Sequence, residues 1–149
     1  MSVRTENSIL IKAPLEKIFE TTANLLLWPT VLPHYRWIRI LEAGDNGWIV
    51  KMAARRGCVP IQWTSRFQVD PNARELHFEH LKAFTRGMRV LWTYTPTPEG
   101  VVVTISHELN RASAFGRWFA HYVLGEMFIR PVATRTLSHF KHYLEQNGA

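Results

Sequence analysis

Val59–Val69 reads VPIQWTSRFQV, and apolar and polar residues alternate along most of it. Side chains at alternate positions of a β-strand point to opposite faces of the sheet. The face predicted to be buried carries Ile61, Trp63, Ser65, Phe67 and Val69. The face predicted to meet solvent carries Gln62, Thr64, Arg66 and Gln68. A strand with one apolar face is typical of an antiparallel sheet that covers a core on one side only.

Five further segments with the same period flank this strand: Tyr35–Ala43, Trp48–Arg56, Glu75–Lys82, Met88–Thr95 and Val101–Leu109. The connections between them are short and rich in Gly, Pro, Asn and Asp. Short turn sequences of this kind predict hairpins that follow one another in sequence order. The middle of the chain is therefore predicted to form a sheet of six antiparallel strands.

The two ends of the chain complete this sheet and cover it. Val3–Lys12 alternates like a strand, Pro14–Asn24 has apolar residues at helical spacing, and Leu25–Pro33 is a short segment interrupted by prolines. Ser113–Gln146 reads as one long helix that Pro131 should kink. We expect an α+β fold in which a curved, seven-stranded antiparallel sheet wraps around this last helix, with two short helices between its first two strands. Only the last helix is expected to cover the concave face.

Length and composition limit the class of protein. A chain of 149 residues is predicted to form a single domain, residues 1–149, and 46% hydrophobic residues with 20% charged residues exclude disorder. The single Cys58 excludes an internal disulfide. The chain has no apolar run long enough to cross a membrane and no secretory signal pattern, so we expect a cytoplasmic protein.

The chain carries 8 Phe, 6 Trp and 4 Tyr, more bulky rings than a core of this size usually uses. Many are predicted to face the concavity together with a few polar side chains. The polar members of this inward set are Tyr35, Ser65, His80, Tyr94 and His107. Sparse polar groups in an apolar, aromatic lining are typical of a small-molecule pocket. A structural role for the two histidines, paired within the core, stays open beside a chemical one.

Four stretches resemble the polyketide cyclase/dehydrase family, which belongs to the START and birch-pollen-allergen-like superfamily of helix-grip folds. They are Ile9-x-Ile11-x-Ala13-Pro14-x-Glu16-x-Ile18-Phe19, Trp28-Pro29-x-x-Leu32-Pro33, Gln62-Trp63-Thr64-Ser65 and Leu91-Trp92-Thr93-Tyr94. The resemblance extends over nearly the whole chain. It implies a deep cavity between the sheet and the C-terminal helix that holds an aromatic polyketide, a quinone, a lipid or another bulky apolar molecule.

The resemblance also implies roles for single residues. Aromatase/cyclases of the family use a cavity arginine, serine and tyrosine, and Tyr35 and Ser65 match the last two. The arginine position is Phe67 here, and a phenyl ring cannot polarise a carbonyl as a guanidinium does. Arg56 is a candidate replacement from the neighbouring strand. The exchange favours ligand binding over aldol chemistry, so enzymatic activity stays open.

The candidate catalytic residues are Tyr35, Ser65, His80 and His107. The candidate ligand-binding residues are Trp28, Arg56, Trp63, Phe67, Phe78, Val90, Trp92, Tyr94, Ile105, Trp118, Tyr122 and Ile129. No metal site and no cofactor are predicted, because His77 and His80 fall on opposite faces of a strand and no glycine-rich phosphate loop is present.

Three functions stay open: a cyclase/dehydrase, a non-catalytic carrier of quinone or lipid, and a basic module that contacts RNA or the ribosome. The net charge of +6 comes from dispersed arginines, which disfavours nucleic acid. Phe115–Ile129 is apolar over more than half of its helical circumference. This breadth favours a homodimer over a lid or a peripheral contact with a membrane.

Overall fold

Seven antiparallel strands form one sheet in the order β1-β7-β6-β5-β4-β3-β2. The computed structural model describes residues 2–45, 47–82, 85–110 and 129–147. The strands are β1 Ser2–Ile11, β2 Tyr35–Gly44, β3 Gly47–Arg56, β4 Val59–Asp70, β5 Glu75–His80, β6 Arg89–Thr97 and β7 Gly100–Asn110. The predicted sheet and its sequence of hairpins are confirmed, although β5 ends two residues earlier than predicted.

Two short helical segments connect β1 to β2, as predicted. The first is α1, Leu15–Ala23, which follows Pro14. The second consists of a 3₁₀ turn, η1 Leu25–Leu27, that leads into the single turn α2, Trp28–Val31. The C-terminal helix α4 spans Arg130–Asn147. Pro131 is the second residue of α4 as described, and residues 113–128 of the predicted long helix lie outside the described residues.

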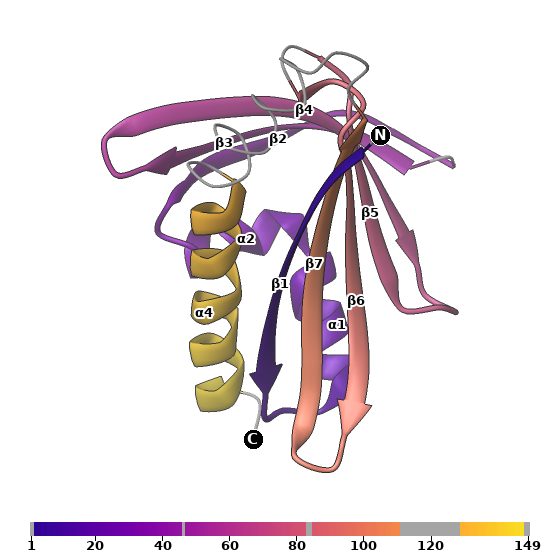
Figure 1. The fold of residues 1–149 in the computed structure, drawn as a ribbon, viewed down its shortest axis with the longest axis vertical. Helices are drawn as coiled ribbons and strands as arrows, with labels where there is room; N and C mark the ends of the chain where they lie inside the picture. Colours follow the sequence, from indigo (N-terminus) through magenta and orange to yellow (C-terminus); the bar gives the residue numbers. More distant parts are fainter. Residues whose placement is uncertain (1, 46, 83–84, 111–128, 148–149) are drawn as a thin grey trace.

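The sheet is strongly bent, so β2, β3 and β4 cross at a steep angle to β1, β5, β6 and β7 (Figure 1). Helix α4 lies alongside β1, and α1 lies behind β6 and β7 in this view. The expectation that the last helix alone covers the concave face is wrong. Thr22 of α1 bonds Tyr94 of β6, and Trp28 of α2 packs on Trp92. The short helices carry buried apolar side chains of their own, which need the same face.

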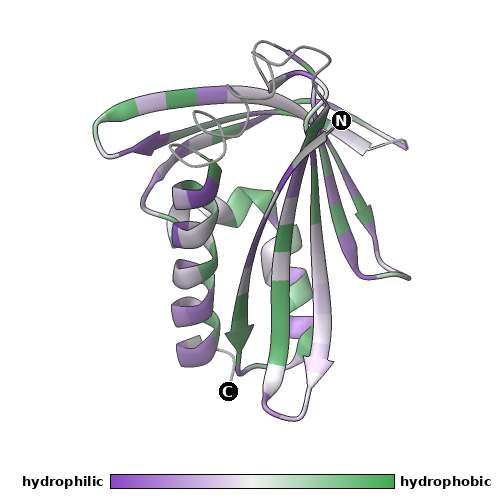
Figure 2. Ribbon diagram, in the orientation of Figure 1, coloured by the Kyte–Doolittle hydropathy of each residue, from purple (hydrophilic) through white to green (hydrophobic). Residues whose placement is uncertain are grey.

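Hydropathy alternates along the strands, and α4 turns its hydrophilic side away from the sheet (Figure 2). Most side chains of the strands have the burial that the predicted faces imply, with two exceptions on β4. Val69 is 42% exposed, because it lies beside the β4–β5 turn at the rim of the sheet. Thr64 is buried although it is on the outer face, where its register partner is the long side chain of Lys51.

Candidate functional site

Four rings on the concave face, Trp28, Phe78, Trp92 and Phe140, pack against one another, and we call them the aromatic cluster. The Trp28 ring lies 5.5 Å from that of Trp92, 5.7 Å from that of Phe140 and 6.0 Å from that of Phe78. Trp28 Nε1 donates a hydrogen bond to the carbonyl oxygen of Thr22 at 3.0 Å. Trp28 and Phe140 are almost fully buried. The aromatic cluster is therefore a packed core.

Tyr94 adjoins the cluster and is also satisfied inside the protein. Its hydroxyl lies 2.6 Å from Thr22 Oγ1, and its ring meets Phe19 edge-on. The Thr22 hydroxyl lies within hydrogen-bond distance of the carbonyl oxygens of Ile18 and Phe19, to which it donates. Tyr94 is then the donor to Thr22. Burial raises the pKa of Tyr94, so its phenol stays protonated.

Tyr35 and His34 meet α4 at Thr136. The Thr136 hydroxyl donates to the carbonyl oxygen of Val132 at 2.8 Å, and His34 Nε2 lies 2.9 Å from the same hydroxyl. Because the Thr136 hydroxyl already donates its only proton to Val132, His34 must be the donor to Thr136 through Nε2, and its Nδ1 is then an acceptor. Burial lowers the pKa of His34 to about 4 and raises that of Tyr35. Both side chains are neutral at pH 7.

Other positions of the concave face carry polar side chains that the sheet places together. Ser65 of β4 is the register partner of His80 of β5, so the two side chains are neighbours. Ser65 is fully buried, and its Oγ has no hydrogen-bond partner among the described residues. The ring of Trp63 stacks parallel to that of His80 at 6.0 Å, and Thr85 Oγ1 lies 2.8 Å from His80 Nδ1.

His107 of β7 completes this group, which we call the polar row: Ser65, His80 and His107. His107 Nδ1 is buried and has no partner in the part of the chain that the structure describes. Burial, with a smaller contribution from the nearby His80, lowers the pKa of His107 to about 3. Burial alone lowers the pKa of His80 to about 4. The polar row therefore presents neutral hydrogen-bonding groups within an aromatic surrounding at pH 7.

A family model described as "Polyketide cyclase / dehydrase and lipid transport" matches residues 2–145. The chain belongs to this family. The bifunctional cyclase/dehydratase of the actinorhodin polyketide synthase from Streptomyces coelicolor is 25% identical over 107 residues, which are 70% of this chain and 34% of the relative. This chain thus spans about a third of the length of that relative.

Solved structures of similar fold include two aromatase/cyclases. The Zhui aromatase/cyclase from Streptomyces sp. R1128 has a TM-score of 0.75 and 17% identity over 100% of both chains. The di-domain aromatase/cyclase StfQ of the steffimycin biosynthetic pathway has a TM-score of 0.78 and 16% identity over 98% of this chain and 52% of its own. The predicted helix-grip fold and family are confirmed.

The remaining candidate ligand-binding residues lie in three different environments. Phe67, Val90 and Ile105 are buried in the core, and Ile129 packs against it. Phe67 lies 4.8 Å from the ring of Phe78, whereas Arg66 is exposed and ion-paired with Glu79. Arg56 is exposed at the β3–β4 hairpin, six positions or roughly 20 Å along β3 from the partner of Ser65. Trp118 and Tyr122 lie outside the described residues, as does all of the predicted dimer segment Phe115–Ile129 except Ile129.

Sequence reasoning missed four polar residues of the interior: Thr5, Asn7, His34 and Thr136. Thr5 and Asn7 share a face of β1 with Ile9 and Ile11, so the period of two carried a signal for them. His34 precedes β2, where no periodic pattern applies. Thr136 reaches His34 across 102 positions of sequence, a contact that the pattern of one helix cannot show.

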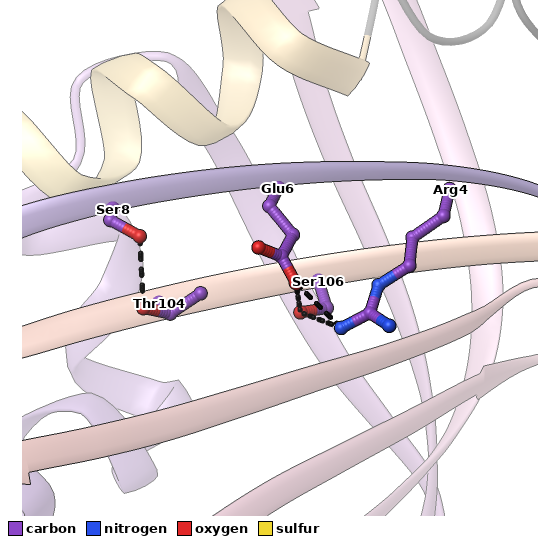
Figure 3. A network of polar contacts seen from close by, with 5 residues as sticks. All are labelled: Arg4, Glu6, Ser8, Thr104 and Ser106. Carbon is purple, nitrogen blue, oxygen red and sulfur yellow. Dashed lines mark hydrogen bonds and ion pairs between the residues drawn. The ribbon is translucent and has the colours of Figure 1, made fainter.

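The outer face of the sheet has a different character. On this face Arg66 forms an ion pair with Glu79 at 3.1 Å, and in the β4–β5 turn Arg74 forms an ion pair with Glu16 of α1. Arg4 bonds Glu6 and Ser106 across β1 and β7 (Figure 3). No group of His, Cys, Asp and Glu suited to a metal is found among the described residues. Nor is any helix in the described part of the chain long and apolar enough to span a bilayer.

Proposed function

We propose that this protein binds a bulky hydrophobic small molecule, a polyketide, a quinone or a lipid, between the sheet and the C-terminal helix. The observation that carries the proposal is the buried Ser65 Oγ, which has no partner among the described residues and lies beside His80 and Trp63. An unpaired buried hydroxyl costs about 1–3 kcal/mol. A ligand oxygen at the polar row would offset that cost.

Two further features support binding of a molecule that is mostly apolar. The rings of Trp63 and Tyr35 lie 5.9 Å apart beside the polar row, and aromatic faces bind flat apolar molecules well. The pKa values of His80 and His107 lie far below 7, so these groups do not require a charged ligand. Membership in a family described by polyketide cyclisation and lipid transport agrees with this class of ligand.

Native mass spectrometry of freshly purified protein from two expression hosts tests the proposal. We expect a co-purifying molecule whose mass is recovered in organic extract. Ser65→Ala should retain less of it, because the ligand loses one hydrogen bond. Ser106→Ala is the matched control, since Ser106 lies on the outer face. A mass equal to that of the bare chain from both hosts would contradict the proposal.

A second candidate function is cyclisation and dehydration of the bound molecule. It is favoured by the position of His80, a neutral imidazole, directly opposite Ser65 in the register of β4 and β5. A neutral imidazole can accept a proton from a ketone-bearing ligand, and the phenol of Tyr35 keeps a proton to donate. Phe67 offers no charge at the position where aromatase/cyclases of the family use arginine.

Turnover of a poly-β-ketone thioester, followed by chromatography and mass spectrometry, tests this second function. We expect Tyr35→Phe and His80→Gln to lower the rate at least tenfold while ligand affinity changes by less than about threefold. His142→Gln, on the exposed side of α4, is the matched control. Equal losses of rate and affinity would assign these residues to binding alone.

A further inference from the structure

β1 divides its polar residues between its two faces. Arg4, Glu6 and Ser8 point to the outer face, where Glu6 contacts Ser106 and Ser8 contacts Thr104 (Figure 3). Thr5 and Asn7 alternate with them and therefore point the other way, toward α4 and the concave face. Both carry a buried side-chain oxygen that has no hydrogen-bond partner within the described ranges.

The orientation of the Asn7 amide follows from its neighbours. The amide nitrogen Nδ2 lies 3.4 Å from the carbonyl oxygen of Arg130 and 2.8 Å from Thr134 Oγ1. A carbonyl oxygen only accepts, so the amide nitrogen must face it and Oδ1 must face away. Oδ1 is thus a buried acceptor, and only a group with an O–H or N–H can satisfy it.

Thr5 supplies a second unpaired group beside His107. The two residues are register partners on β1 and β7, and their side chains share one face. Thr5 is 4% exposed, and its hydroxyl can both donate and accept. His107 Nδ1 adds a third unpaired atom at the same place. Three unpaired polar atoms gathered near the start of α4 need an explanation beyond packing.

We propose that Thr5, Asn7 and His107 form a binding site for a hydroxyl group of the ligand. The ligand is then a phenol, an enol or an alcohol, because a molecule whose oxygens are all ketones leaves Asn7 Oδ1 without a donor. The site adjoins the polar row through His107, so the ligand carries this hydroxyl in addition to the oxygen that faces Ser65. This inference rests on the proposed function.

Two probes of nearly equal shape test the site, 2-naphthol and 2-methylnaphthalene, titrated into the whole protein by calorimetry. Thr5→Val keeps the volume of the side chain and removes its hydroxyl. We expect the ratio of the two dissociation constants to shift about fivefold toward 2-methylnaphthalene in Thr5→Val, and by a similar factor in His107→Leu. Ser8→Ala, on the outer face of the same strand, should leave the ratio unchanged.

Thermal unfolding of the unliganded variants completes the test. The melting temperature of Thr5→Val should not fall, because the hydroxyl has no bond to lose in the free protein. If both probes bind and the ratio is the same in wild type, Thr5→Val and His107→Leu, the hydroxyl site is wrong and the proposed function stands. If neither probe binds the wild-type protein, the proposed function fails and the hydroxyl site fails with it.

Discussion

The aromatic cluster and the polar row lie on the same concave face but differ in whether the polar atoms there have hydrogen-bond partners. Near the cluster, Trp28 Nε1, the Tyr94 hydroxyl and the Thr22 hydroxyl all have partners at 3.0 Å or less. In the polar row, Ser65 Oγ and His107 Nδ1 are buried without a partner in the described part of the chain. The polar groups near the aromatic cluster are paired within the protein, whereas two atoms of the polar row have no partner among the described residues.

Under the proposed function, one sheet serves both stability and binding. Packed rings contribute folding energy through the apolar area that they remove from water. Unpaired buried polar groups cost folding energy, which a protein tolerates where they serve a function. Substitutions in the two regions should therefore affect different measurements.

The largest expected effect is on the aromatic cluster. Trp28→Ala removes a ring that contacts Tyr35, Phe78, Trp92 and Phe140, and should lower the free energy of unfolding by about 3–5 kcal/mol. Urea denaturation followed by circular dichroism measures the change. Leu26→Ala, at a side chain that is 63% exposed, is the control and should change stability by less than about 0.5 kcal/mol. A loss below about 1 kcal/mol for Trp28→Ala would show that the cluster is not the packed core.

Acid should weaken the protein through the polar row. Burial lowers the pKa of His80 from 6.5 to about 4, so between these values the unfolded chain binds a proton that the folded chain does not. Stability is then constant above pH 6.5 and falls below it, by about 2 kcal/mol from pH 7 to pH 5 for this histidine. His107 acts in the same direction.

Urea denaturation at pH 7 and pH 5 checks this dependence. In His80→Gln the loss between the two pH values should be smaller than in the wild type by about the contribution of one histidine. His142→Gln, on exposed α4 surface, should show the same loss as the wild type. An unchanged pH dependence in His80→Gln would mean that His80 is protonated in the folded protein.

The sequence predicted the sheet well because each strand repeats one physical constraint. Alternation along Val59–Val69 placed Trp63, Ser65 and Phe67 on one face, and the register with β3 and β5 agrees. It erred at Val69, where the strand runs to the rim and no longer covers a core. Alternation reports which face a side chain takes but not whether anything covers that face.

The site was harder to predict because its geometry depends on contacts between distant elements. Nothing local to Trp28 or Trp92 indicates that these two rings pack against each other and against Phe140, which is why Trp28 and Trp92 were expected to line a cavity. The pairing of His34 with Thr136 likewise requires β2 and α4 to be docked. The family resemblance singled out Ser65 and Tyr35 as candidates, yet it could not show which polar atoms lack partners.

The smallest effect separates the two regions most directly. Tyr94→Phe removes a satisfied hydroxyl beside the aromatic cluster and should lower the free energy of unfolding by about 1 kcal/mol. Ser65→Ala removes an unsatisfied one from the polar row and should leave stability unchanged or raise it slightly, because no hydrogen bond is lost. Ligand affinity should respond in the opposite order, with a loss of about tenfold in Ser65→Ala and little in Tyr94→Phe. Urea titrations of the two variants measure the changes in stability, and ligand titrations measure the changes in affinity. Equal destabilisation by the two variants would mean that Ser65 Oγ is hydrogen-bonded in the free protein. The aromatic cluster and the polar row would then not differ in this respect.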